Sequence, residues 1–167
     1  MINPGNKELR AKQDLKTKFL IDELKPAQTD KVKHEAESVF GPEFMQKMFS
    51  TDFKKHGQVA TALQYSLETQ PENLIMSIDV VFKWGIIKLL ESQNTTFSGQ
   101  LFDFYSVLFA KMTEIEYKLW DTEAVLIIPF VCNNLGLQNM ILRDKVKALF
   151  KQLFGIYDHK LILKYVF

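Results

Sequence analysis

Apolar residues recur every three or four positions through most of the chain, and this spacing constrains the fold more than any other feature. The clearest case lies between residues 97 and 112, where the apolar positions are Phe97, Leu101, Phe104, Tyr105, Leu108, Phe109 and Met112. Such spacing places these side chains on one face of an α-helix. The sequence has no long apolar/polar alternation and only 7 glycines, so strands are poorly supported. We therefore expect an all-α fold.

Turn and capping residues divide the chain into successive helices. We expect them at roughly residues 30–48, 52–69, 71–91, 96–112, 122–134, 138–154 and 158–166, the first interrupted at Gly41-Pro42. Hydroxyl side chains that accept from the first free backbone N–H groups are the natural N-caps. The expected caps are Thr29, Ser50 or Thr51, and Thr122.

The segment 71–91 is apolar on nearly all sides, so neighbouring helices must cover more than one of its faces. Trp84 is expected in the core. Gly85 costs about 1 kcal/mol relative to alanine inside a helix, which indicates a point where another helix approaches closely.

Pairs of these helices repeat about every 40 residues, which is typical of a HEAT-like or armadillo-like α-solenoid. We expect about three antiparallel pairs and one further helix. In such a stack the turns inside the pairs align along one edge, and the turns between pairs lie on the opposite edge. The turns expected on the first edge are Ser50–Lys55, Ser92–Thr96 and Asn134–Asn139.

Composition and motifs argue against catalysis and against several classes of partner. The net charge of +1 provides no field that would attract nucleic acid. The uncharged run from Ala124 to Leu142 is interrupted by Pro129, Gly136 and amide side chains, so we expect two helices around a corner instead of a membrane span. No metal-ligand, phosphate-binding or nucleophile motif occurs. We expect no enzyme activity, cofactor, bound metal or small-molecule substrate.

The chain has one cysteine, Cys132, and lacks a signal-peptide pattern at its start. A single cysteine cannot form an intramolecular disulfide, which favours a reducing compartment such as the cytoplasm. Cys132 lies in an apolar run, so we expect a buried, unreactive thiol.

Four separated segments resemble, in order, the TOG domains of the microtubule polymerase family. They read MFSTDFKKHGQVATAL, IDVVFKWGIIKLLESQNTTFSGQLFDFYSVLF, EYKLWDTEAVLIIPFVCNNLG and RDKVKALFKQL, and the likeness extends from about Lys7 to Phe167. The fifth TOG domain of the animal-type members is the most similar. The resemblance implies a paddle of about six HEAT repeats that binds the αβ-tubulin heterodimer, free or in the microtubule lattice, through the turns inside the pairs.

The resemblance also implies a role in microtubule assembly and spindle organisation, on microtubules, the spindle or the centrosome. The implied tubulin-binding residues are Phe53, Lys54, Lys55, Asn94, Thr95, Thr96, Asn139, Arg143 and Lys145. Phe53 stands where many family members have a tryptophan, and its ring lacks the indole N–H donor.

Most of these assignments have a structural alternative. Phe53 could pack inward as an early residue of its helix, with Lys54 and Lys55 on the solvated face. Asn94, Thr95 and Thr96 also suit a helix cap, and Arg143 could pair with Asp144 on the surface. A helical scaffold for another protein, without tubulin binding, is the alternative function.

Residues 1–28 form a basic N-terminal extension in this interpretation, and residues 29–167 a partial TOG domain. The basic residues of the extension are Lys7, Arg10, Lys12, Lys16 and Lys18. They form either a solvated face or a lateral contact on the microtubule lattice. The missing repeats predict an uncapped apolar end at Leu161, Ile162, Leu163, Val166 and Phe167.

Overall fold

The structure is a computed structural model that describes residues 1–166, and over this range every regular element is a helix. The elements are α1 (Lys7–Lys16), α2 (Pro26–Val39), α3 (Pro42–Met48), α4 (Phe53–Thr69), α5 (Pro71–Ile75), α6 (Ile78–Glu91), α7 (Thr95–Glu114), α8 (Asp121–Asn134), α9 (Met140–Leu153) and α10 (His159–Val166). The expected all-α fold is confirmed. The expected helix 71–91 is divided into α5 and α6, because the backbone leaves helical geometry at Ser77.

Helix starts differ from the sequence expectation. Thr29 lies inside α2, which begins at Pro26; proline suits the first helical position because it has no backbone N–H that would need a partner. Thr122 lies inside α8, because that helix begins directly after Trp120. The cap of α4 is Asp52 instead of Ser50 or Thr51. The three predicted hydroxyl caps are therefore wrong, and carboxylate or amide side chains cap α4, α7 and α9 instead.

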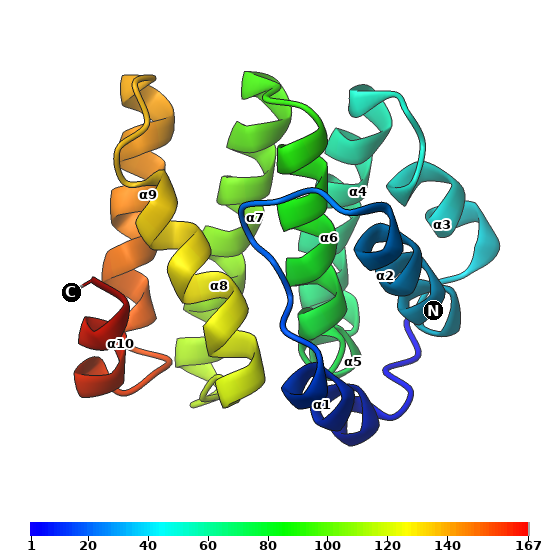
Figure 1. Cartoon of the computed structure of the whole chain (residues 1–167), viewed down its shortest axis with the longest axis horizontal. Coiled ribbons are helices and arrows are strands. Elements are labelled where there is room, and N and C mark those ends of the chain that lie inside the picture. Colours follow the sequence, from blue (N-terminus) through cyan, green and yellow to red (C-terminus); the bar gives the residue numbers. More distant parts are fainter. Residues whose placement is uncertain (167) are drawn as a thin grey trace.

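The helices form two layers, as Figure 1 shows. One layer contains α4, α7 and α9, which pack side by side in that order. The other contains α2, α6 and α8, with α10 against α8. Successive helices alternate between the layers in antiparallel pairs, as expected of an α-solenoid.

Helix α6 lies at the centre of the molecule. Every residue from Ile78 to Lys88 is buried, so neighbours cover all of its faces as predicted. Trp84 is fully buried, and its indole N–H donates to the Met48 carbonyl at 2.8 Å. A side chain at Gly85 would collide with the Tyr105 hydroxyl of α7, which confirms the predicted close approach.

Helix α1 packs across the layer of α2, α6 and α8 through ionic contacts. Its residues at positions 7, 10 and 14 share one helical face and each joins an ion pair. Lys7 pairs with Glu123 at 2.7 Å, and the Arg10 guanidinium donates to both carboxylate oxygens of Asp79 at 2.8 and 3.0 Å. Lys7 and Arg10 are therefore buried and do not belong to a solvated basic face.

The third contact of α1 is a cluster around buried Lys83. The Lys83 ammonium donates to Asp14 of α1 at 2.8 Å and to Glu35 of α2 at 2.9 Å. Lys12, Lys16 and Lys18 remain exposed. These contacts tie α1 to the solenoid, while the division of the chain at residue 28 stays a prediction.

The last described helix, α10, leaves part of its apolar surface uncovered. Ile162 is buried, Leu161 is half-buried, and Leu163 and Val166 are exposed. Phe167, which the sequence also places in this group, lies outside the described residues. None of the helices within residues 1–166 is both long enough and apolar enough to cross a membrane.

Candidate functional site

The three turns that connect α3 to α4, α6 to α7 and α8 to α9 lie along one edge of the molecule, at the top of Figure 1. Each turn leads into a helix of the same layer, and each of these helices starts with a side-chain cap: Asp52, Asn94 or Asn139. The caps recur at intervals of slightly more than 40 residues, close to the repeat length. We call this row of turns the turn edge.

In the first turn, Phe53 is the first residue of α4 and its side chain is 39% exposed. Lys54 and Lys55 are exposed beside it, and neither forms an ion pair with a described residue. The Asp52 carboxylate accepts from the Lys54 N–H at 3.0 Å. The aromatic side chain is thus partly presented to solvent, and is not packed into the core as in the alternative interpretation.

Buried aromatic side chains support this turn from below. The His56 ring is bonded through Nε2 to the Ser50 carbonyl at 2.7 Å. It also meets the Trp84 and Phe97 rings edge-on, at centroid distances of 6.2 and 5.6 Å. Burial lowers the pKa of His56, which favours a neutral ring at the base of the turn. Phe97 belongs to α7, so the first and second turns share one rigid support.

In the second turn, the Asn94 side chain accepts from the Phe97 N–H at 2.9 Å and caps α7. Thr95 and Thr96, the first two residues of α7, are exposed. The cap and an outward hydrogen-bonding surface therefore coexist here, as the sequence allows.

In the third turn, Asn139 caps α9 by accepting from the Leu142 N–H at 3.1 Å. Arg143 is half-buried, and its Nε has no hydrogen-bond partner among the described residues. The Lys145 ammonium forms an ion pair with Asp103 of α7 at 2.5 Å. This pair joins α7 to α9, so the Lys145 charge is already engaged within the protein.

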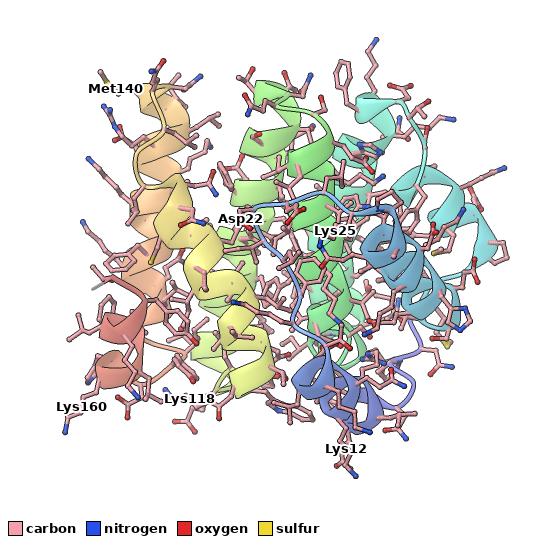
Figure 2. All side chains as sticks on the ribbon, viewed as in Figure 1. Lys12, Asp22, Lys25, Lys118, Met140 and Lys160 are labelled. Atoms are coloured by element: carbon pink, nitrogen blue, oxygen red, sulfur yellow. The ribbon has the colours of Figure 1, made fainter. Side chains whose placement is uncertain are left out.

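Sequence reasoning missed two exposed apolar residues of the same turn. Met140 is 65% exposed and Ile141 is 71% exposed, and they are the first two residues of α9. Figure 2 labels Met140 at the turn edge, with Lys118 and Lys160 at the opposite edge. The signal that could have revealed them is the helical phase of α9. Its buried face begins at Leu142 and continues through Val146 and Leu149, so the two residues before Leu142 point outward.

A hollow of about 550 Å³ opens between the second and third turns. Its apolar walls include Ile86, Leu90, Phe102, Phe130 and Leu142. Amide and hydroxyl side chains from both turns complete it, among them Gln93, Thr95, Gln138 and Asn139. The hollow is continuous with the turn edge, because residues of both turns line it.

The turn edge offers apolar, cationic and hydrogen-bonding groups over a long row, which suits contact with a macromolecule. Within residues 1–166, no group of three or more His, Cys, Asp or Glu side chains is placed to hold a metal ion. Cys132, expected to be buried, is only partly so, and burial raises the pKa of its thiol.

No protein-family model matches the chain. Its sequence is similar to Protein MOR1 of Oryza sativa subsp. japonica, with 28% identity over 165 residues, or 99% of this chain and 8% of that protein. Protein MOR1 of Arabidopsis thaliana is 27% identical over 154 residues, or 92% and 8% of the two chains. Centrosomal protein 224 of Dictyostelium discoideum is 24% identical over 113 residues, or 68% and 5%. The chain thus spans less than a tenth of the length of these relatives.

Two solved structures have closely similar folds. One, described as "TOG-tubulin binding specificity promotes microtubule dynamics and mitotic spindle formation", superposes with a TM-score of 0.87 and 17% identity, covering 98% of this chain and 64% of that one. The TOG domain structure from C. elegans Zyg9 gives a TM-score of 0.83 and 16% identity, covering 93% and 59%. The likeness to the fifth TOG domain in particular stays a prediction. The chain therefore has the fold of a TOG domain.

Proposed function

We propose that this chain binds the tubulin heterodimer, free or in the microtubule lattice, through its turn edge. In this proposal it is a non-catalytic module that contributes to microtubule assembly and spindle organisation in the cytoplasm and cytoskeleton. One structure of the same fold is described in terms of TOG-tubulin binding, and one relative is named as a centrosomal protein. Both descriptions support the proposal.

The arrangement of the three turns is the observation that carries this proposal. Residues about 90 positions apart in sequence, from Asp52 to Asn139, lie in one row because the paired helices stack in register (Figure 1). A partner that reads this row touches several separate segments at once. Such a surface suits a folded protein partner better than a small molecule.

The charge and exposure of the first turn favour a partner whose surface is acidic and contains an apolar recess. Phe53 offers an aromatic anchor, and interface energy concentrates in such anchors. Lys54 and Lys55 flank it with free positive charge. The N-terminal ends of α4, α7 and α9 also face this edge, and each adds a partial positive charge.

The variant Phe53→Ala/Lys54→Glu/Lys55→Glu should lose co-elution with tubulin in gel filtration, because it removes the anchor and reverses both charges. Its circular dichroism should remain helical, because all three side chains are exposed and the Asp52 cap is retained. Binding of the unmodified chain should weaken as salt is raised, because exposed charge contacts are screened.

A matched control lies in α10, where Figure 2 shows Lys160 at the opposite edge. Leu163→Ala/Lys160→Glu/Lys164→Glu makes the same kinds of change, and Leu163 is 45% exposed, close to the exposure of Phe53. This control should bind tubulin normally. Failure of the unmodified chain to co-elute with tubulin, or equal binding by all three proteins, would reject the proposal in favour of a helical scaffold for another protein.

A further inference from the structure

We propose that a groove on the face of the α2, α6 and α8 layer binds a peptide segment of another protein that is acidic in one half and apolar in the other. The groove consists of two hollows beside the C-terminal end of α1, one of about 350 Å³ and one of about 400 Å³. The two hollows share Asp14, Lys18 and Phe19, so they adjoin. No residue of the turn edge lines either hollow, and the inference is independent of the proposed function.

The segment between α1 and α2 builds the groove. After Lys16 the chain leaves the helix and crosses the face of α6 before it enters α2 at Pro26 (Figure 1). Gln28 fixes this segment, because its side-chain oxygen accepts from the Leu20 N–H at 2.8 Å and its amide donates to the Leu20 carbonyl at 2.9 Å. Phe19, from the same segment, packs against the core. The groove is therefore held in shape before any partner arrives.

The hollow of about 350 Å³ lies between this segment and α2, and we call it the basic hollow. Its walls are mostly apolar and include the Phe19 ring. Lys18, which is exposed, and Lys31, which is half-buried, also line it, and neither forms an ion pair with a described residue. Lys25 is exposed beside them, and its ion pair with Glu23 is a 3.9 Å contact in solvent.

Two carboxylates also line the basic hollow, and both are already engaged. Asp14 and Glu35 accept from the Lys83 ammonium at 2.8 and 2.9 Å. Lys18 and Lys31 therefore carry charge that remains free for a partner. An apolar hollow flanked by free ammonium groups favours a segment that combines carboxylates with apolar side chains, because opposite charges across an interface select the partner.

The hollow of about 400 Å³ shares Phe19 with the basic hollow and continues the groove between α1 and α8 to Tyr165 of α10. Leu15 and Val125 line it and are 77% and 46% exposed, so this half presents apolar surface to solvent. Exposed apolar groups that gather beside a hollow are typical of an interaction surface. Asp121 also lines this half and disfavours a carboxylate there. A bound peptide should therefore place its carboxylates beside α2 and its apolar residues beside α8.

Two synthetic peptides test the inference. Each joins a run of glutamates to the block Leu-Phe-Ser-Leu, in opposite orders, and carries fluorescein for anisotropy measurements at low and high salt. We expect saturable binding of at least one peptide, weakened by salt because exposed charges are screened. Lys18→Gln/Lys31→Gln should weaken this binding about fivefold or more, because two charge contacts are lost. Leu15→Ser/Val125→Ser should weaken it about tenfold at both salt concentrations, because less apolar surface is buried.

Matched controls make the same kinds of change elsewhere. Lys12→Gln/Lys33→Gln removes the same charge from exposed lysines that line neither hollow. Tyr65→Ser/Val107→Ser alters side chains that are 66% and 46% exposed on α4 and α7, in the other layer. Both controls should bind the peptide like the unmodified chain. Circular dichroism should be unchanged in every variant, because each substituted side chain is exposed or half-buried.

The outcomes separate this inference from tubulin binding. Failure of both peptides to bind, or equal binding of peptides with lysines in place of the glutamates, would overturn the inference and leave the proposed function intact. Loss of tubulin affinity in Lys18→Gln/Lys31→Gln would also overturn it, because the lysines would then belong to the tubulin contact. So would a requirement for these lysines only in binding to vesicles of equal parts phosphatidylcholine and phosphatidylserine. Peptide binding by a chain that does not bind tubulin would reject the proposed function alone.

Discussion

Gly85 shows how a single residue sets the spacing between the two layers. It lies in α6 opposite Tyr105 of α7, and an added Cβ would collide with the Tyr105 hydroxyl and lie 3.2 Å from a methyl group of Leu101. Tyr105 is fully buried, and its hydroxyl has no hydrogen-bond partner among the described residues. Burial raises the pKa of Tyr105, so this hydroxyl stays protonated.

This contact gives a prediction about stability. Gly85→Ala should destabilise the fold by about 1–3 kcal/mol, because overpacking outweighs the better helix propensity of alanine. Tyr105→Phe should be neutral or stabilising, because it removes an unpaired buried hydroxyl. It should also restore much of the stability lost in Gly85→Ala. Urea unfolding followed by circular dichroism measures all three; a stabilising Gly85→Ala would contradict the contact.

The sequence indicated the close approach at Gly85 and the core position of Tyr105 separately. Their pairing could not be predicted, because helical periodicity gives the buried face of each helix but not the register between two helices. The same limit applies to Trp84 and its bond to the Met48 carbonyl.

Among the elements, α1 is unusual because ion pairs dominate its attachment. Lys7 bonds to a charged residue of α8, and Arg10 and Asp14 bond to charged residues of α6. The helix has few apolar residues of its own. The periodic apolar pattern that reveals the other helices is weak here. A usable sequence signal lay in α6, because Asp79 and Lys83 are charged residues in its mostly apolar first half and must be paired when buried.

Removal of Lys7 tests how α1 is held. Lys7→Met leaves the Glu123 carboxylate buried without its cation. The free energy of unfolding should therefore fall by about 3–5 kcal/mol, unless α1 detaches and exposes the carboxylate. In either case, amide hydrogen exchange in α1 should accelerate. Lys12→Met, on the exposed side of the same helix, should change neither stability nor exchange.

The Lys7 variant also has a defined pH dependence. Burial raises the pKa of Glu123, and Lys7 opposes that rise. Without Lys7 the folded-state pKa should rise further above the unfolded value, so protonation favours the folded state. The loss of stability caused by Lys7→Met should therefore be largest near neutral pH, and it should shrink as the pH falls through the folded-state pKa of Glu123. An unchanged deficit between about pH 7 and pH 5 would contradict the pairing.

At the scale of the whole molecule, the sequence predicted the stacked helix pairs and the row of turns because both follow from the repeat period. It could not decide whether Phe53 faces inward, because position 53 lies at the start of its helix. The direction in which the first helical residue points is known only when the capping residue is known. It also missed Met140 and Ile141, because apolar residues at the start of an apolar helix look like core. The ion pair between Lys145 and Asp103 is a contact between helices that periodicity does not reveal.

We propose that three turns distant in sequence act as one binding surface. Amide hydrogen exchange of the chain with and without tubulin tests it most directly. We expect tubulin to slow exchange together at residues 52–55, 94–97 and 139–143, and to leave the opposite edge, at residues 69–71, 115–120 and 155–158, unchanged. Slowed exchange at only one of the three turns, or at the opposite edge instead, would contradict the account.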